Sequence, residues 1–182
     1  MLFRSYRQDR TQANFVAIMD LFLDIDHIPI VHPELYTAID VPTAQEIEWR
    51  TWAGGSIQFV PTLEGSNPDW AELTAQKKNP YGALWLAQYP YTQFEWQPGA
   101  VFIQVNQPVS DSETISHIFK YKDFNYSEKN WRINEEVWET AWAQDRTQAE
   151  LLEPGWRFRQ QNLEKEKIAY RKFLHEIGRA HV

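Results

Sequence analysis

The chain has 182 residues, a hydrophobic fraction of 43% and a formal net charge of −7 at pH 7. This length predicts one domain over residues 1–182, with enough chain to bury a sizeable core. The acidic balance and the lack of a basic run argue against nucleic acid and anionic membrane surfaces as partners. Because cysteine is absent, the chain can form no disulfide, no thiolate zinc site and no cysteine nucleophile, and it cannot ligate an iron–sulfur cluster.

No apolar run approaches the ~20 residues of a membrane span. The first residues, MLFRSYRQDRTQ, lack the apolar core of a signal peptide, so we expect a cytoplasmic protein. Aromatic residues make up 15% of the chain, nine of them Trp, which favours a large core or an aromatic-walled cavity.

Residues 1–10 are polar, and we expect a frayed lead-in there. The following stretch, 11–26, has apolar side chains at helical spacing and predicts a helix with one buried face. The residues at this spacing are Phe15, Ile18, Met19, Phe22 and Leu23.

His27 and His32 follow directly, with four residues between them. On an ideal helix, side chains five residues apart lie about 140° apart, so a regular helix cannot direct both imidazoles to one point. Pro29 disfavours α geometry at Ile28, and Pro33 does so at His32. We therefore predict that the helix breaks between the two histidines, at the prolines, and that this break lets both rings converge. The alternative is a buried histidine beside a surface histidine.

The period then changes from helical to alternating, which predicts a series of antiparallel strands. They are expected at 46–52, 56–61, 83–89, 92–96, 100–106 and 114–124. Residues 62–80 form a polar connection, and Pro98-Gly99 marks a tight turn. On the last strand His117 shares a face with Phe119 and Tyr121, so it either contacts a ligand in a cavity or forms a cross-strand pair at the sheet surface.

After the strands the pattern becomes helical again. Ser127 can cap a helix that runs to about Glu153 and ends at Pro154-Gly155. A last amphipathic helix is expected over 159–177, and His175 and His181 in this region receive no role. The order of elements predicts an α+β fold, a curved antiparallel sheet with helices on one side that encloses a cavity.

The helix after Ser127 should bury a stripe that contains Trp131, Trp138, Trp142 and Ala149. Asp145 shares this apolar face. A lone carboxylate there is unfavourable unless it is paired or binds a metal ion. Two imidazoles and one carboxylate suit ferrous iron that binds dioxygen. A salt bridge to Arg146, or a solvated position at the edge of the stripe, is the alternative for Asp145.

These two segments resemble the iron-binding segments of the Rieske non-haem iron oxygenases, the large subunits of ring-hydroxylating dioxygenases and related demethylating monooxygenases. In DLFLDIDHIPIVHP (20–33), Asp24, His27 and His32 fill the family's Asp and two His positions. Gln144-Asp145-Arg146 with Glu150 is similar to the segment of the third ligand. The resemblance implies a helix-grip catalytic domain in which His27, His32 and Asp145 hold one Fe(II). The chain departs from the pattern at Leu21, where the family has Asn, and it carries no Rieske domain.

The resemblance also implies the activity and the partners. The chain is expected to hydroxylate or demethylate an apolar, aromatic substrate with O2. Asp24 would relay electrons and orient the imidazole of His27. A separate Rieske ferredoxin or Rieske-domain protein would supply the electrons by docking near Asp24, His27 and residues 33–40. Homotrimers are common in the family, so a homotrimer is the oligomer that the resemblance suggests.

Two rival classes stay open. The missing cluster and Leu21 favour a non-catalytic domain of the same fold, which binds a hydrophobic molecule and keeps a vestigial iron site. The second rival class is a regulatory or structural subunit of a larger oxygenase. It would resemble the small α+β subunits of these enzymes, but those subunits lack the two-histidine segment. A zinc hydrolase with the same three ligands would need a general base, and none stands beside them in the sequence.

Overall fold

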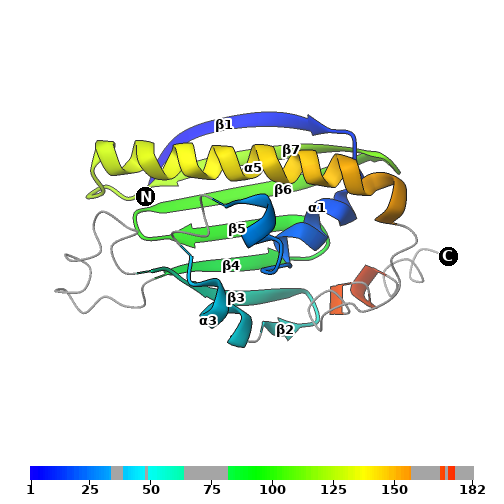
Figure 1. Cartoon of the computed structure of the whole chain (residues 1–182). Coiled ribbons are helices and arrows are strands. Elements are labelled where there is room, and N and C mark those ends of the chain that lie inside the picture. The colour runs from blue at the N-terminus through cyan, green and yellow to red at the C-terminus, as the bar shows by residue number, and fades with distance from the viewer. Residues whose placement is uncertain (34–38, 48, 64–81, 157–168, 171, 175–182) are drawn as a thin grey trace.

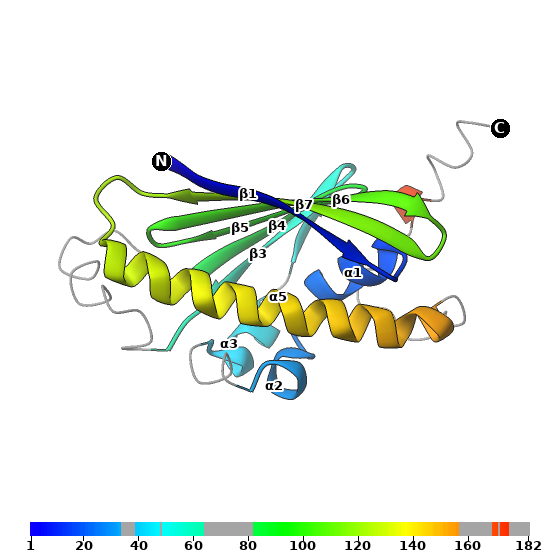
Figure 2. The same cartoon turned by 90° about the horizontal axis from the view of Figure 1, so that it is seen from above.

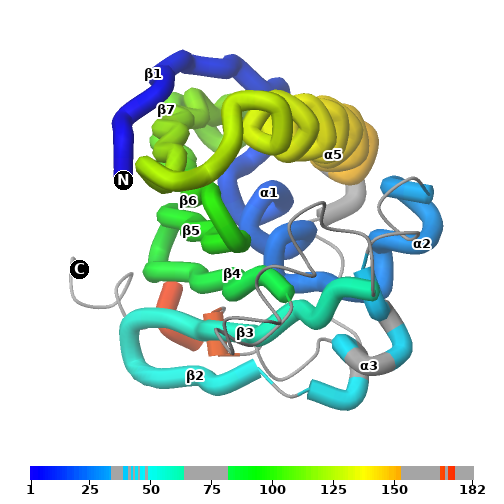
Figure 3. The backbone as a smooth tube through the Cα atoms, turned by 90° about the vertical axis from the view of Figure 1, so that its left-hand side faces the viewer, coloured from blue at the N-terminus to red at the C-terminus, as the bar shows by residue number. Residues whose placement is uncertain are grey.

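The computed structural model describes residues 1–33, 39–47, 49–63, 82–156, 169–170 and 172–174. Its centre is one antiparallel sheet of seven strands in the order β1-β7-β6-β5-β4-β3-β2 (Figure 1). The sheet curves around the helices of residues 15–22, 28–31, 41–46 and 128–156, which lie on its concave side when the molecule is viewed along the long helix (Figure 3). The predicted α+β helix-grip architecture is confirmed.

Most of the predicted strands are present with small changes at their ends. The strands are β1 (Leu2–Thr11), β2 (Arg50–Trp52), β3 (Gly55–Pro61), β4 (Gly82–Gln88), β5 (Thr92–Gln97), β6 (Ala100–Ser110) and β7 (Glu113–Lys122). The prediction of a half-buried strand over 46–52 is wrong in length and burial. Glu46, the first residue of the predicted strand, is the last residue of helix α3 (Val41–Glu46). Only the exposed Arg50–Trp52 pairs with β3.

The N-terminal residues form an edge strand, so the predicted frayed lead-in is wrong. β1 pairs antiparallel with β7 along its whole length, from Leu2 opposite Lys122 to Thr11 opposite Thr114. The apolar alternation that would have predicted a strand is missing because the inward-facing side chains include Arg7 and Asp9. Charged groups on the facing helix pair with both of these residues.

The first helix is shorter than predicted. Helix α1 (Phe15–Phe22) begins after Asn14, whose side chain accepts a hydrogen bond from the backbone N–H of Val16 at 2.9 Å. It cannot begin at Thr11 because that residue still belongs to β1. The face of α1 that carries Ile18 and Met19 is buried against the sheet, as the helical spacing predicted.

The long helix α5 (Glu128–Trp156) spans the concave face, with α2 (Ile28–Val31) and α3 on the same side of the sheet (Figure 2). Ser127 caps α5, since its hydroxyl accepts the N–H of Asn130 at 3.1 Å. The predicted buried stripe is confirmed: Trp131, Trp138, Trp142 and Ala149 are all at most 9% exposed. The helix continues through Pro154 and Gly155 to Trp156, so its predicted end was too early.

The predicted last helix lies mainly outside the described residues, as do His175 and His181. Residues 169–170 and 172–174 are helical. Tyr170 is fully buried against α1 and β4, and its hydroxyl donates to the carbonyl of Pro90 at 2.6 Å. This contact closes the end of the core that lies away from the start of α5.

The main core lies between α5 and strands β6 and β7. The ring of Phe102 stacks on Trp131 and Trp138, with centroids 5.9 Å and 4.9 Å away. The predicted turn at Pro98-Gly99 is present, and Gly99 has φ +84. A Cβ at Gly99 would lie 2.2 Å from the Tyr126 ring, so this position requires glycine. No helix among the described residues is long and apolar enough to cross a membrane.

Candidate metal centre

The predicted break between the two histidines is wrong: the chain breaks before His27, and His27 and His32 flank one short helix. The chain leaves α1 at Leu23, turns through residues 24–27, and re-enters a short helix at Ile28. Pro29 occupies the first turn of α2, where a missing N–H breaks no hydrogen bond, so the prediction that it removes Ile28 from α geometry is wrong. Pro33 acts as predicted: His32, just before it, has φ −124 and ψ 62 and ends α2.

The structure brings His27, His32 and Asp145 together. Nε2 of His27 lies 3.1 Å from Nε2 of His32, and both nitrogens face Oδ1 of Asp145, at 3.3 Å and 2.8 Å. These three side chains come from the α1–α2 turn, the end of α2 and the middle of α5. Among the described residues, these three side chains form a group that could hold a metal ion, because their ligand atoms all lie within 4.8 Å of one another.

The hydrogen bonds of the outer ring nitrogens fix how the imidazoles face this point. Nδ1 of His27 lies 2.5 Å from the backbone carbonyl of Asp24, and Nδ1 of His32 lies 2.6 Å from Oε1 of Gln144. Both partners are acceptors, so each Nδ1 carries the proton and each Nε2 presents a lone pair. With both rings neutral, two nitrogen lone pairs and a carboxylate oxygen converge on one point. Either a metal cation or protonation of an imidazole balances this group.

The spacing of the three atoms fits a metal ion. Ligand atoms about 2.1 Å from one ion and at right angles to each other lie about 3.0 Å apart. The observed separations of 2.8, 3.1 and 3.3 Å fall around this value. Two histidines and one carboxylate on one side of an ion form the facial triad of non-haem iron sites, which leaves the remaining positions open.

In the metal-free site, His27 and His32 change the pKa of Asp145. Burial alone would raise the pKa of Asp145, but hydrogen bonds from His27 and His32, together with the positive charge of these rings, outweigh burial and lower it. A carboxylate that stays ionised at neutral pH is the form that binds a metal ion.

Asp24 contacts His27 through its backbone and not through its carboxylate. Oδ1 of Asp24 accepts the backbone N–H of Asp26 at 2.8 Å, while its carbonyl oxygen holds the His27 ring. The part of the prediction that assigned ring orientation to the Asp24 carboxylate is therefore corrected. Gln144 holds His32, a role that the sequence analysis missed, although Gln144 belongs to the motif segment.

A cavity of about 190 Å³ opens beside the three residues. Cavities near 150 Å³ hold a benzene-sized molecule, so the space suits a small ligand. The aromatic side chains of its wall are Phe22, Trp85, Phe102, Trp138 and Trp142.

One acidic side chain besides Asp145 lines this cavity. Burial raises the pKa of Glu95 from 4.5 to about 7, and the negative charge of Asp145 adds to the rise, while the Trp138 hydrogen bond and His32 oppose it. The sequence analysis missed Glu95, which alternates with apolar Phe94 and Trp96 and so resembles a surface acid.

His117 is not part of the cavity. Its Nδ1 lies 2.9 Å from the hydroxyl of Tyr6, and its Nε2 lies 2.9 Å from Oε1 of Gln107. The ring also stacks on Tyr6, with centroids 6.2 Å apart, on the face of the sheet that points away from α5. The prediction of a substrate contact is corrected to its alternative, a cross-strand pair at the sheet surface.

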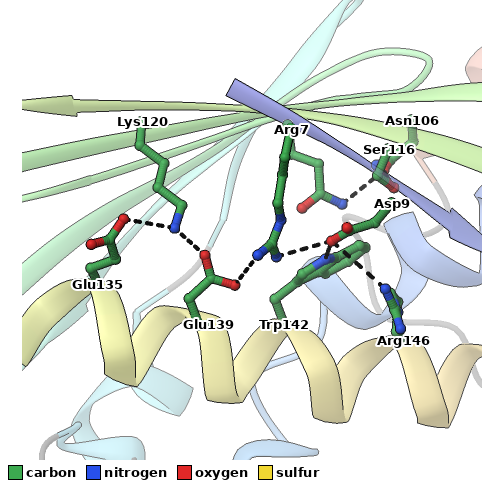
Figure 4. A network of polar contacts seen from close by, with 10 residues as sticks. Arg7, Asp9, Asn106, Ser116, Lys120, Glu135, Glu139, Trp142 and Arg146 are labelled. Atoms are coloured by element: carbon green, nitrogen blue, oxygen red, sulfur yellow. Dashed lines mark hydrogen bonds and ion pairs between the residues drawn. The ribbon is translucent and has the colours of Figure 1, made fainter. Parts of the chain in front are cut away.

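A network of charged side chains fixes α5 against the edge of the sheet and thereby positions Asp145 (Figure 4). Lys120 on β7 pairs with Glu135 and Glu139 on α5, and Glu139 also pairs with Arg7 on β1. One turn further along, Asp9 accepts the indole N–H of Trp142 at 2.7 Å, and it lies 3.7 Å from Arg146.

Comparison with known proteins gives structural neighbours and no sequence relatives. No protein-family model and no curated protein matches the chain. The quaternary ammonium Rieske monooxygenase CntA with an inhibitor bound has a TM-score of 0.71 at 13% identity, over 99% of this chain and 49% of CntA. Dicamba monooxygenase bound to 3,6-dichlorosalicylic acid has a TM-score of 0.66 at 10% identity, over 98% of this chain and 60% of its own. NdmA of Pseudomonas putida CBB5 with caffeine has a TM-score of 0.64 at 19% identity, over 98% of this chain and 53% of NdmA.

The fold is that of the catalytic domain of Rieske oxygenases. The chain spans only about half the length of the Rieske oxygenases that it matches. At these identities the likeness concerns the Rieske oxygenase fold alone. The resemblance of residues 20–33 and 144–150 to that family predicted this fold, and the prediction is confirmed.

Proposed function

We propose that this chain is the catalytic domain of a mononuclear non-haem Fe(II) oxygenase, with His27, His32 and Asp145 as the iron ligands. The observation that carries the proposal is the convergence of two Nε2 atoms and a carboxylate oxygen at metal-ligand spacing. Bound there, ferrous iron supplies the centre at which dioxygen is reduced.

The rest of the chain contributes position and surroundings. Gln144 and the Asp24 carbonyl hold the two imidazoles in the tautomer that points Nε2 inward. The aromatic wall of the cavity keeps water from the reacting carbon and holds an apolar substrate body beside the ligand atoms. We therefore propose hydroxylation or demethylation of a small substrate with a largely apolar, aromatic or alkyl, body.

The structural neighbours do not select the substrate. Their names pair the fold with carnitine, with dicamba and with caffeine, which differ in charge, size and aromaticity. What they share with this chain is the fold, and the choice of substrate depends on side chains that differ between them at 10–19% identity.

The electrons would come from an iron–sulfur cluster outside these 182 residues, because a sequence without cysteine cannot ligate one. We propose that a Rieske ferredoxin or Rieske-domain protein docks beside Asp24 and His27 and that Asp24 relays the electrons. The exposed side chain of Ile30, 83% accessible and one turn from His27, gives this surface an apolar contact point. A homotrimer and a cytoplasmic location belong to the same proposal.

A non-catalytic ligand-binding domain is the second candidate function. Leu21, at the position where the resembled family has Asn, is 7% exposed and packs in the main core, so the chain offers no amide near the proposed iron from there. In that case the cavity would bind its ligand and the three converging side chains would be a vestige.

Iron content separates the two functions. After anaerobic reconstitution with Fe(II), the enzyme should hold about one iron per chain, as measured by mass spectrometry, whereas protein without bound iron supports the binding domain. Turnover should then require a Rieske protein. Steady turnover with NADH and a reductase but no Rieske protein refutes the partner dependence, and iron bound without any turnover in its presence refutes the enzyme.

A further inference from the structure

Glu95 is an acid enclosed by aromatic rings on the floor of the cavity. In the antiparallel register it stands directly opposite Trp85 on β4 and Phe102 on β6. Side chains at such paired positions have Cβ atoms about 5 Å apart and point to the same face of the sheet. From the helix side, the indole N–H of Trp138 donates to Oε2 of Glu95 at 3.1 Å. Three aromatic side chains therefore surround one carboxyl group.

No cation pairs with Glu95 among the described residues. Its polar contacts are the Trp138 indole and a weak hydrogen bond from Nε2 of Gln97 at 3.4 Å. Three acids between α5 and the edge of the sheet are compensated: Glu135 and Glu139 by Lys120, and Asp9 by Arg7. The positive group nearest to Glu95 is His32, which is already paired with Asp145 at 2.8 Å, so a ligand that brings its own positive charge would stabilise the Glu95 carboxylate.

The walls around Glu95 suit a diffuse positive charge. The Phe102 and Trp138 rings are nearly parallel, at 11°, and Trp138 stacks on Trp142 at 6.4 Å, so a continuous aromatic surface lines one side. Trp85 stacks on Phe22 at 5.6 Å on the other side. Stacking covers much of these ring faces, and Nζ of Lys120 already lies 5.5 Å from the centroid of the Trp138 ring. The wall therefore offers apolar contact to the alkyl groups of a cation, and the charge is matched by Glu95.

A second unsatisfied group lies next to Glu95. Trp85 is 9% exposed, lines the cavity, and its indole N–H has no acceptor in the described part of the chain. A buried indole N–H normally finds a partner. A ligand that carries an oxygen acceptor near its charged group would satisfy this donor and the Glu95 carboxylate together.

We propose that the cavity binds a small organic cation, an alkylated ammonium group that also carries an oxygen acceptor, with the Glu95 carboxylate as its counter-ion. The inference rests on the proposed function only in that this molecule would be the substrate of the oxygenase. Binding of the cation itself depends on Glu95 and the aromatic wall and does not need iron.

The test compares two probes that differ only in charge. Choline carries a trimethylammonium group and a hydroxyl, and 3,3-dimethyl-1-butanol has the same shape and hydroxyl without the charge. Titration calorimetry on the full chain should give choline an affinity at least about tenfold higher than its neutral analogue. Glu95→Gln should reduce this preference to near one, and Glu95→Asp should keep part of it. Glu136→Gln, an exposed acid on α5, should leave it unchanged.

Several results overturn the cation site. They are equal or better binding of the neutral analogue, a choline preference that survives Glu95→Gln, and binding of neither probe up to about 10 mM. The wild-type comparison stands even if Glu95→Gln does not fold. Iron content measured on the same preparations keeps the two proposals apart. A choline preference without bound iron contradicts the oxygenase only, whereas bound iron without the preference contradicts the cation site only.

Discussion

Oε1 of Gln144 lies 2.6 Å from Nδ1 of His32, on the far side of the ring from Asp145. Gln144 and Asp145 are consecutive residues of α5, so one turn of helix holds the imidazole from both sides. His32 is only 2% exposed, and its ring cannot turn away without losing the Gln144 contact. This arrangement ties the protonation of Nδ1 to the lone pair on Nε2.

The first prediction concerns Gln144→Leu, which removes the acceptor for His32. The ring then loses its orientation and its preferred tautomer, and iron affinity should fall about 10- to 100-fold, the usual effect of removing such a partner. Competition with a chelator of known affinity measures it. Gln148→Leu is the control, since Gln148 lies one turn further along α5 and lines the same surface hollow as Gln144, whereas the hydrogen bond to His32 comes from Gln144. Equal effects of the two substitutions would contradict the role of Gln144.

The sequence motif predicted the three candidate metal ligands but not the groups that orient their side chains. His27, His32 and Asp145 are recognisable because their types and spacing match a known motif and because an acid on an apolar stripe is unusual. The Asp24 carbonyl that holds His27 leaves no trace in the sequence, since any residue has a carbonyl. Pro29 made the local prediction wrong because its effect depends on its position in the helix. A proline in the first turn is tolerated and one in the interior is not, and the sequence alone did not show where this helix begins.

The faces of the central strands were the hardest feature to predict. In β5, Phe94 and Trp96 alternate with Gln93 and Glu95, and simple amphipathicity would bury the aromatic pair. The structure does the reverse: Trp96 is 39% exposed and Gln93 is 6% exposed. The same inversion in β7 buries Lys120 and leaves Phe119 and His117 on the outer face, which explains the error at His117. A concave face that lines a cavity carries polar groups, so the period identifies the strand without telling which side is inside.

The second prediction is a pH dependence of stability that Glu95 causes. Because the folded protein binds the Glu95 proton more tightly than the unfolded chain does, this group's stabilisation is complete below pH 4.5 and is lost as pH rises through about 7. Asp145 and His32 are the charged groups that face it, and Glu95→Gln leaves both in place. The stability of wild type relative to Glu95→Gln should fall by about 2 kcal/mol between about pH 5 and about pH 8, less than the full shift because the side chain keeps some exposure.

Urea unfolding of the metal-free proteins at several pH values measures this difference. Glu136→Gln should differ from wild type by an amount that does not change with pH. A pH-independent difference between wild type and Glu95→Gln would show that the carboxyl group is well solvated in the folded protein.

The third prediction concerns Asp9, which anchors Trp142 and lies between Arg7 and Arg146. Asp9→Asn removes the charge at constant size. Arg7 keeps Glu139 as a partner, but both guanidinium groups lose the Asp9 carboxylate and the Trp142 N–H loses a charged acceptor, so the unfolding free energy should fall by about 2 kcal/mol. Glu113→Gln is the matched control on the same edge of the sheet. Its partner Arg10 is 59% exposed, and such surface pairs contribute at most about 1 kcal/mol. Denaturant unfolding followed by Trp fluorescence measures both, and the network is not stabilising if Asp9→Asn equals the control.

The last prediction separates iron binding from electron supply. Asp145→Asn weakens a ligand and should abolish stoichiometric iron. Asp24→Asn keeps the carbonyl that holds His27 and an oxygen for the Asp26 N–H, so the fold and the iron site should persist. If the Asp24 carboxylate relays electrons, reduction of the iron by a Rieske partner should slow by at least about tenfold at unchanged iron content. Asp26→Asn, two residues away and exposed, should change neither quantity. Stopped-flow single-turnover measurements decide this, because they report electron arrival apart from substrate binding. Unchanged reduction in Asp24→Asn would mean that electrons enter by another path, and loss of iron in this variant would mean that its carboxylate supports the metal after all.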